Sequence, residues 1–572
     1  MSLLAALVRA YDSRPDMPAL NYSMETVSFL IPLKSDGAPP PVPVDLRAYR
    51  KSSGRVTNVS VPKPVKRTSA VVPNFLWDKT SYSLGISARP HERTAAEHAK
   101  FVQWHLELLS GNKDAGLIAF ADFLRRWRPD MFRVLGWPEE MTDKNLVFGL
   151  EGKWDADEGG ISCIHQRPAA RELWASINKS RESGSGACLV TGRPGAVARL
   201  HPTIKGVLGA QPSGASLISF NLDAFCSYEH LQGDNSPISE ASAFKYGAML
   251  NRYLEFGSRN KLQVGELSLV FWADGPEADA ANIENLFASL IEPDVSGIVP
   301  FDLPEAKTRL GKAARADFHV LGISPNSARL IVRFHVQDSF ENILVHLLEH
   351  QNLMRIQNAA GLEELSLGRT LSGTAMFAKA EHLSCSLVAN FVTRVLAGEP
   401  YPHQVLQAVI MRLRSDKKTT LSRVALLKAI LIRNYGIPLA PALDPENNET
   451  HYLLGRLLAT FDFVEQEARG GGLGTPVSAV HYAVASSNPA RCFPTLALKA
   501  TQNIDKIRAR KPALSVICHR LIDDLLPKAA LKMVRMSTQD LCQQALFAVG
   551  CYHQRQEFYR SPKNAPHASA IE

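Results

Sequence analysis

Hydrophobic positions along the 572-residue chain change their spacing near residue 340. Before that point, short apolar runs alternate with turn residues in NLVFGLEG, ACLVTG, ASLISFN, ELSLVFWADG and ARLIVRFHV. Such runs, bounded by Gly, Pro, Asn or Asp, are typical of strands. Helical spacing of apolar residues occurs between them, as in EHAKFVQWHLELL and SEASAFKYGAMLNRYLEFG. Residues 1–340 are therefore predicted to form an α+β region. Within it, ISPNSARLIVRF predicts a hairpin with Pro325 and Asn326 in its turn.

After residue 340 the strand pattern ends and amphipathic helices follow one another. They include FENILVHLLEHQNLMRI, LSRVALLKAILIRNYG, HYLLGRLLATFDFVEQEARG and DLCQQALFAVGCYHQRQEFY. Helices with one apolar face that follow each other in this way predict a bundle. The turn-rich segment PALDPENNET favours a boundary near residue 445. We therefore expect a helical connecting region at 341–445 and an all-α bundle at 446–572.

Composition limits the cellular setting and the chemistry. The chain contains no run of about 18 apolar residues, and its first residues, MSLLAALVRAYDSRPD, lack the pattern of a secretory signal. We expect a cytoplasmic protein without membrane contact. The 8 cysteines occur singly, without C-x-x-C pairs, and are expected to be reduced thiols.

Charge is distributed unevenly along the chain. Residues 1–100 carry 14 Lys and Arg against 8 Asp and Glu, a net charge of +6. Residues 101–400 carry 28 against 35, a net charge of −7, and residues 401–572 carry 22 against 13, a net charge of +9. Basic ends around an acidic middle favour contact with a polyanion at both ends, although solvated helices carry similar biases.

One motif suggests metal chemistry. HLLEH matches the H-x-x-E-H pattern of a zinc hydrolase, with His346 and His350 as ligands and Glu349 as the base. An ordinary helix face gives the same letters. No Walker loop, G-x-x-x-x-G-K-[ST], and no G-x-S-x-G elbow is present, so these motifs give no support for phosphate-binding or nucleophilic catalysis, and we expect no cofactor.

Three segments offer groups for binding nucleic acid. Lys63, Lys66 and Arg67 lie in an extended, proline-containing arm, followed by Asn74 and Lys79 in PNFLWDKTSYSLG. The segment KGVLGAQPSGASLISFN combines Lys205, Gln211 and Ser213 with several glycines, as expected for a loop that enters a groove or for a plain surface turn. The third segment, KATQNIDKIRARK, carries Lys499, Lys506, Arg508, Arg510 and Lys511, which suit a single-stranded phosphate backbone or a solvated helix face.

Several segments together resemble one family, the large subunit of the type I-C CRISPR surveillance complex (Cascade), of the Csd1/Cas8c type. The resemblance rests on NFLWDKTSYSLG, CLVTGRPGAVARLHPTIKGVLGAQPSGASLISFN, AFCSYEHLQGDNSPISEASAFKYGAMLNRYL, LVFWADG and LFAVGCYHQRQEFY, which occur in the family's order. The closing segment has Cys551 where an aromatic residue is expected, and Pro212 lies beside Gln211.

The resemblance implies a non-catalytic subunit that reads the protospacer-adjacent motif on double-stranded DNA while a guide RNA reads the target. It implies that the subunit supports R-loop formation, binds the displaced strand and recruits a helicase-nuclease. The implied partners are CRISPR RNA, the backbone and guide-processing subunits, and a small subunit translated separately from the C-terminal helices.

Under this interpretation Asn74, Lys79, Lys205, Gln211 and Ser213 contact the motif. Phosphate contacts are assigned to Lys63, Lys66, Arg67, Lys499, Lys506, Arg508, Arg510 and Lys511. A scaffold that binds single-stranded nucleic acid without reading a motif is the alternative function.

Overall fold

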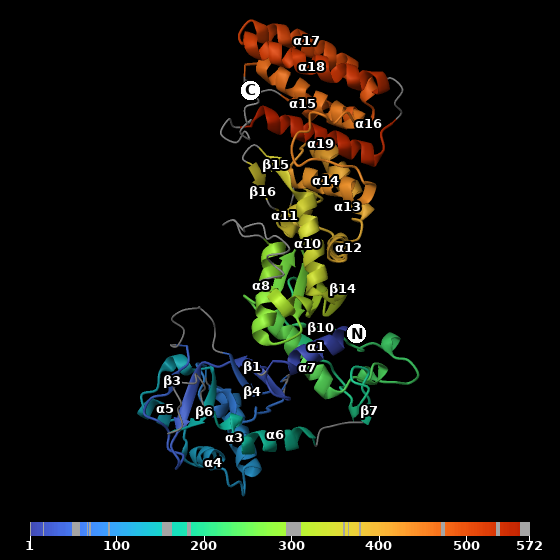
Figure 1. The fold of residues 1–572 in the computed structure, drawn as a ribbon. Helices are drawn as coiled ribbons and strands as arrows, with labels where there is room; N and C mark the ends of the chain where they lie inside the picture. The colour runs from blue at the N-terminus through green and yellow to red at the C-terminus, as the bar shows by residue number, and fades with distance from the viewer. Residues whose placement is uncertain are drawn as a thin grey trace. The chain divides into compact units, whose positions relative to one another are not determined.

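The structure is a computed structural model, and its described residues form two compact units (Figure 1). It describes residues 2–14, 16–47, 58–65, 67, 70–89, 92–151, 163–179, 185–292, 310–358, 361–363, 365–376, 379–470, 475–533 and 538–560. Unit 1 comprises Met1–Pro202 and Ser219–Met249, and unit 2 comprises Thr203–Ile218 and Leu250–Glu572. The chain therefore passes between the units three times.

Unit 1 is built around a four-stranded sheet with the order β3-β2-β6-β5. These strands are β2 (Phe29–Leu33), β3 (Val44–Asp45), β5 (Trp77–Lys79) and β6 (Asn145–Leu150). Strands β2 and β6 are parallel, and the outer strands are antiparallel to them. Helices α3 (Glu92–Leu108) and α4 (Ala115–Arg126) contribute Phe101, Phe120 and Phe123 to the core that also contains Phe29 and Phe148.

The other elements of unit 1 are short. They are α1 (Leu3–Asp12), β1 (Tyr22–Thr26), β4 (Asn58–Pro62), α2 (Thr80–Ser83), α5 (Met131–Val134), α6 (Pro168–Lys179), β7 (Ser185–Ala187), β8 (Pro194–Ala196) and most of α7 (Glu240–Tyr253). Strand β1 pairs with β4, and β7 pairs with β8, both antiparallel. Of the predicted strand ACLVTG only Ala187 lies in a strand, β7, and of ASLISFN only Ala215 and Ser216 do, as β10.

Unit 2 begins with a six-stranded sheet of order β11-β12-β13-β14-β10-β9. Its strands are β9 (Thr203–Ile204), β10 (Ala215–Ser216), β11 (Lys261–Val264), β12 (Leu267–Ala273), β13 (Asp317–Asn326) and β14 (Arg329–Ser339). All of β12 is buried, which explains why its residues are apolar except Ser268, whose hydroxyl donates to Gln263. Helices α8 (Glu277–Ile291) and α10 (Phe340–Met354) bring Phe287 and Phe340 against Phe318 of β13, with ring centroids 4.8 Å and 5.1 Å apart.

The β13–β14 hairpin is present, but its turn differs from the prediction. Pro325 pairs with Leu330 and Asn326 pairs with Arg329, so the turn consists of Ser327 and Ala328. Ser327 has a φ of +55°, the left-handed conformation that such tight hairpin turns require. The sequence prediction was wrong because Pro and Asn are frequent turn residues, whereas here they end a strand.

The rest of unit 2 is mainly helical. It contains α11 (Leu367–Ser372), α12 (Cys385–Leu396), α13 (His403–Asp416), α14 (Leu421–Tyr435), α15 (Thr450–Ala468), α16 (Val477–Ser487), α17 (Phe493–Arg508), α18 (Pro512–Met533) and α19 (Leu541–Phe558). A short antiparallel pair, β15 (Ile356–Asn358) and β16 (Gly361–Glu363), lies in the part predicted to be purely helical. Residues 450–461 of α15 are all buried, so this helix is central to the bundle.

Two glycines allow α15 to lie close to α19. A Cβ atom at Gly455 would overlap the carbonyl oxygen of Phe547, and one at Gly550 would overlap that of Tyr452. The predicted α+β class with a helical C-terminal part is confirmed by these elements. The α+β part is divided between the two units, whereas the boundary near residue 445 stays a prediction.

Candidate nucleic-acid interface

The glycine-rich segment forms a loop at one edge of the unit 2 sheet. Strands β9 and β10 are antiparallel, with Ile204 paired to Ala215, and residues 205–214 connect them. Within this glycine loop the Ala210 N–H donates to the carbonyl of Val207 at 3.2 Å, and the Gly214 N–H donates to that of Gln211 at 2.8 Å. The loop therefore consists of two successive turns.

Two glycines let the loop pack closely against its own unit. Gly206 has a φ of +82° and Gly214 a φ of +95°. A Cβ atom at Gly206 would overlap the carbonyl oxygen of Leu254, and one at Gly214 would overlap the side chain of Thr203. The absence of side chains at these two positions is thus used for contacts within unit 2.

Two side chains anchor the base of the loop. Asn251 accepts a hydrogen bond from the Lys205 N–H at 2.7 Å through Oδ1 and donates to the Thr203 carbonyl at 3.1 Å through Nδ2. Lys261 Nζ donates to the Gly206 carbonyl at 2.6 Å. These hydrogen bonds fix the backbone while leaving the tip of the loop exposed.

Three side chains of the glycine loop are available for an external partner. Lys205, Gln211 and Ser213 are all exposed. Their side-chain polar atoms have no hydrogen-bond or ion-pair partner within the described part of the chain. The structure brings these three predicted site residues together on one anchored loop.

Arg67, in the basic arm, has a different environment. Its guanidinium pairs with both oxygens of Asp78, a residue that is 1% exposed, and its Nε donates to the Val72 carbonyl at 2.7 Å. It also lies over the ring of Tyr82, 3.9 Å from the centroid. Burial raises the pKa of Asp78, while Arg67 and the N–H groups of Asn74 and Lys79 act in the opposite direction. Arg67 therefore compensates a buried carboxylate.

The neighbouring candidates differ in exposure. Asn74 is 5% exposed, and its Oδ1 accepts from the Val65 N–H at 3.1 Å, whereas its amide nitrogen has no partner among the residues described. Lys79 is exposed at the end of β5, and its ammonium is likewise unpaired within the described ranges. Lys63 is exposed, and Lys66 lies outside the described residues. These residues belong to unit 1, whereas the glycine loop belongs to unit 2.

The basic cluster of the bundle lies on α17 and in the turn before α18. All five of its residues, Lys499, Lys506, Arg508, Arg510 and Lys511, are exposed. Arg510 donates to the Ala468 carbonyl, and Lys511 pairs with Glu467 at 2.7 Å, so both link this turn to the end of α15. Arg508 pairs with Asp505 at 3.3 Å, and Lys506 donates to Asn503 at 3.3 Å.

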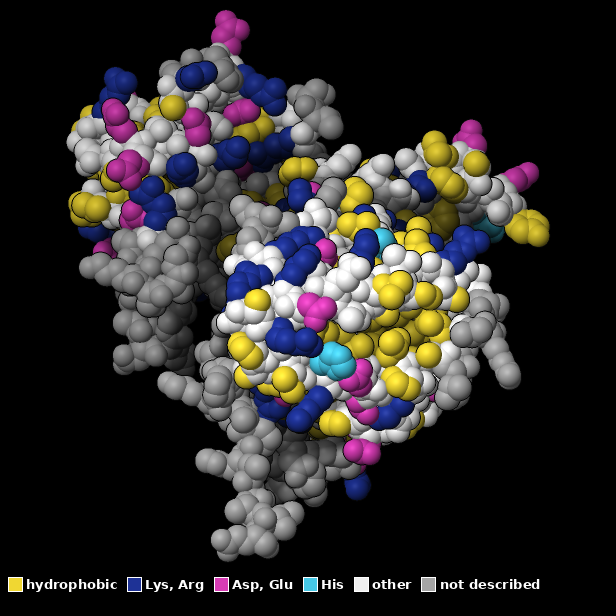
Figure 2. Space-filling view, turned by 90° about the horizontal axis from the view of Figure 1, so that it is seen from above, with side chains coloured by type: hydrophobic (Ala, Val, Ile, Leu, Met, Phe, Trp, Pro, Cys, Tyr) yellow, Lys and Arg dark blue, Asp and Glu magenta, His cyan; other side chains and the backbone are white. Residues whose placement is uncertain are grey.

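Exposed hydrophobic side chains also lie on α17 and α18. Leu498 is 69% exposed and Ile517 is 60% exposed. Seen from the side of α17 and α18, a patch of hydrophobic side chains is bordered by Lys and Arg side chains together with some Asp and Glu (Figure 2). Surfaces that bind single strands combine cations for phosphates with apolar or aromatic groups for bases.

The HLLEH motif lies in α10, and its side chains contact protein groups. His346 Nδ1 donates to the Leu396 carbonyl at 2.8 Å, and Glu349 pairs with Arg433 at 3.2 Å. His350 Nδ1 is 2.8 Å from the Tyr401 hydroxyl, and burial lowers the pKa of His350 to about 3. Among the described residues, no group of three His, Cys, Asp or Glu is arranged to hold a metal ion.

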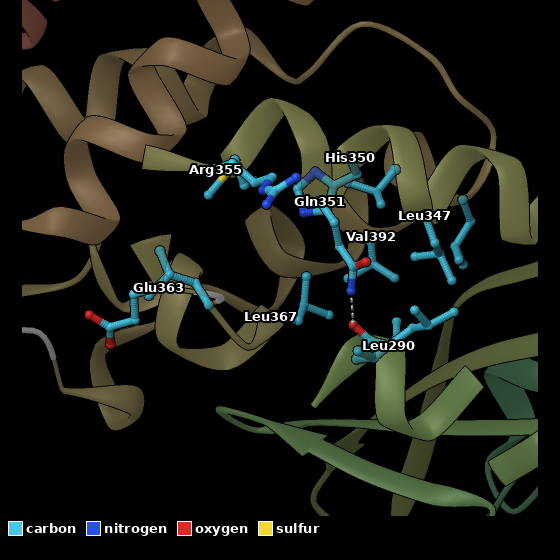
Figure 3. Close-up of a pocket in the computed structure, with 13 residues that line it drawn as sticks. Leu290, Leu347, His350, Gln351, Arg355, Glu363, Leu367 and Val392 are labelled. Carbon is cyan, nitrogen blue, oxygen red and sulfur yellow. Dashed lines mark hydrogen bonds between the residues drawn. The ribbon is translucent and has the colours of Figure 1, made fainter. Parts of the chain in front are cut away.

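A cavity of about 30 Å³ lies beside His350 (Figure 3). Leu347 and Val392 contribute to its apolar wall, and Gln351 donates to the Leu290 carbonyl at 2.8 Å. This volume is sufficient for about one or two water molecules and too small for a substrate. The geometry of α10 therefore gives the zinc-hydrolase interpretation no support.

The family of the chain follows from its match to a family model. Residues 5–559 match the model of the family described as CRISPR-associated protein (Cas_Csd1). The chain belongs to this family. No curated protein matches the sequence. Membership extends over both units, so the anchored glycine loop and the basic helices are parts of one CRISPR-associated protein. In the described ranges, no helix is both long enough and apolar enough to span a bilayer.

Sequence reasoning missed the residues that support the candidate groups of this CRISPR-associated protein. Asn251 and Lys261 anchor the glycine loop, and Asp78 is the partner of Arg67. Asn251 lies in a regular amphipathic helix and Lys261 in a short strand, where their residue types carry no special signal. Asp78 had a weak signal, because a carboxylate that directly follows the apolar residues Phe75, Leu76 and Trp77 must be paired if it is buried.

Proposed function

We propose that this CRISPR-associated protein is the non-catalytic large subunit of a type I-C surveillance complex and reads the protospacer-adjacent motif on double-stranded DNA. The observation that carries the proposal is the glycine loop. Its backbone is fixed by Asn251 and Lys261, while Lys205, Gln211 and Ser213 remain exposed without partners within the described part. A fixed loop loses little conformational entropy when it binds.

The chemistry of the loop suits a short motif. An amide such as that of Gln211 can donate to one base-edge atom and accept from another, and Ser213 offers a hydroxyl with both capacities. Lys205 supplies a cation for a phosphate, which positions the loop without reading sequence. Pairing with the guide RNA then determines the rest of the target.

In unit 1, Lys63 and Lys79 are exposed and the amide nitrogen of Asn74 has no partner among the described residues, which supports their assignment to contacts with double-stranded DNA. Arg67 is assigned to the support of this arm, since its charge is already used by Asp78.

The rest of the function follows from the same assignment. The basic surface of α17 binds the displaced strand during R-loop formation, and the subunit recruits the helicase-nuclease. Its other partners are CRISPR RNA, the backbone and guide-processing subunits, and a separately translated small subunit.

Replacement of Gln211 tests motif reading. In the assembled complex, Gln211→Ala is expected to reduce discrimination between duplexes with and without the motif by about 1–3 kcal/mol, because one base contact is lost. Lys205→Ala is expected to weaken both duplexes equally and to lower the salt dependence by about one unit. The measurement is the equilibrium binding of both duplexes over a range of salt concentrations.

Gln404→Ala is the matched control, since Gln404 is an exposed glutamine of α13 outside the loop. If Gln211→Ala and Asn74→Ala both leave discrimination unchanged, the proposed interface is wrong. Equal affinity of the wild-type complex for every flanking sequence would instead favour a scaffold for single-stranded nucleic acid.

A further inference from the structure

A second, larger cavity lies in the helical bundle, between α15, α16 and α17. Its volume is about 290 Å³. Phe461 of α15 and Leu496 and Ala500 of α17 are buried residues of its wall, and Val480 of α16 is an exposed residue at its edge. The lining residues of α17 recur at three- and four-residue intervals, so one face of this helix borders the cavity.

Polar side chains of the same cavity lie on each of the three segments. Lys499 and Asn503 come from α17, His481 from α16, and Arg469 from the end of α15. Arg469 pairs with Glu465 at 2.6 Å and donates to the Thr475 carbonyl at 3.2 Å. Its charge is therefore largely compensated by a carboxylate that also lines the cavity.

Lys499 and His481 differ from Arg469 in their side-chain contacts. Neither side chain has a hydrogen-bond or ion-pair partner in the ranges that the structure describes. Asn503 accepts from Lys506 through Oδ1, and its amide nitrogen has no partner there. The cavity thus combines an apolar wall with one uncompensated cation, an imidazole and an amide donor.

We propose that this cavity binds one nucleotide of a single-stranded nucleic acid, with the base inside and the phosphate on Lys499. The inference rests on the proposed function, in which the strand is the displaced DNA strand, and it identifies where that strand is held. A base has a flat apolar face for the wall near Phe461 and polar edges for Asn503 and His481, while the cavity is too small for a duplex. This combination favours a nucleotide over a simple anion, which would need no apolar wall.

The test compares two oligonucleotides of equal length and charge on the full chain. One is fluorescently labelled oligo(dT), and the other has abasic sites in place of the bases. The wild-type chain is expected to bind oligo(dT) at least fivefold more tightly, since stacking one base is worth about 1–3 kcal/mol. His481→Ala and Val480→Asp, which change the cavity near its edge, are expected to remove most of this preference.

Lys499→Ala is expected to weaken both oligonucleotides and to lower the salt dependence by about 0.7 units, the value for one phosphate contact on a single strand. Lys528→Ala is the matched control, since Lys528 is an exposed lysine of α18 outside the cavity and should leave both affinities unchanged. Circular dichroism spectra that match the wild type verify that each variant is folded.

Equal wild-type affinity for oligo(dT) and the abasic strand would overturn the inference. Unchanged preference in both His481→Ala and Val480→Asp would also overturn it. These outcomes are independent of motif reading, which is measured on duplexes through Gln211, so the inference and the proposed function can fail separately.

Discussion

At the scale of single residues, the partners of a charge decide its role. Arg67 and Lys79 are both cations near the amino end, yet Arg67 compensates the buried Asp78 whereas Lys79 is exposed and unpaired within the described residues. Removing one member of a buried ion pair leaves the other charge without compensation, which is strongly destabilising. Removing an exposed, unpaired cation changes stability little.

Arg67→Ala is therefore expected to lower the free energy of unfolding by about 3 kcal/mol. Lys79→Ala, the control, should change it by less than about 0.5 kcal/mol. Urea denaturation measures both. A stable Arg67→Ala variant with weaker, salt-dependent DNA binding would show instead that Arg67 contacts phosphate.

His105 gives a pH dependence with a definite sign. Its Nε2 accepts from the Leu76 N–H at 2.9 Å, its Nδ1 donates to the Phe101 carbonyl at 2.8 Å, and burial lowers its pKa to about 3. In the unfolded chain a histidine binds a proton near pH 6.5. Between about pH 6.5 and 3 the unfolded state therefore binds more protons, and His105 reduces stability as the pH falls.

His105→Gln keeps one donor and one acceptor but does not titrate. Its free energy of unfolding, measured in urea from about pH 6 to pH 4, should vary with pH less steeply than that of the wild type, by about 1.4 kcal/mol per pH unit. His403→Gln, at an exposed position of α13, is the control. An identical slope in wild type and His105→Gln would contradict the assignment.

At the scale of elements, glycines of the glycine loop allow the loop to pack closely against the rest of unit 2. Gly206 combines a φ of +82° with contact to the Leu254 carbonyl, whereas Gly192 has a φ of +69° with nothing within 4 Å of an added Cβ. At either position, an alanine in the left-handed backbone conformation lowers stability by about 1–2 kcal/mol. At Gly206 the added Cβ atom also overlaps the Leu254 carbonyl oxygen, so the backbone must shift as well.

Gly206→Ala should therefore destabilise the protein more than Gly192→Ala, by at least about 1 kcal/mol, in urea denaturation. It should also reduce motif discrimination by the assembled complex, because the loop that carries Gln211 is displaced. Equal effects of the two substitutions on stability and on discrimination would show that the contact with Leu254 does not shape the loop.

At the scale of the whole molecule, periodic hydrophobic patterns were enough to predict the buried strand β12, the β13–β14 hairpin and the helices of the bundle. Such elements depend on neighbouring residues in the sequence. Residue types also selected Lys205, Gln211 and Lys499, which the structure shows to be exposed, while their role in binding nucleic acid stays a prediction. The roles of Arg67 and Asn251 were not, since each depends on a partner, Asp78 or Thr203, that only the folded chain brings near.

The division into two units could not be predicted from the sequence either, because it depends on pairing between distant segments. Strand β10 joins the unit 2 sheet through the pairing of Ser216 with Arg329, while residues 219–249 between them return to unit 1. No local pattern marks this exchange, and the sequence prediction accordingly treated 1–340 as one region.

This interlaced path has a consequence for synthesis on the ribosome. When residues 203–218 emerge, strand β14 has not yet been made, so β10 can pair with it only after Arg329 has been synthesised. By then all segments of unit 1 have been synthesised, since the last of them ends at Met249, so the unit 2 sheet is completed after the chain of unit 1.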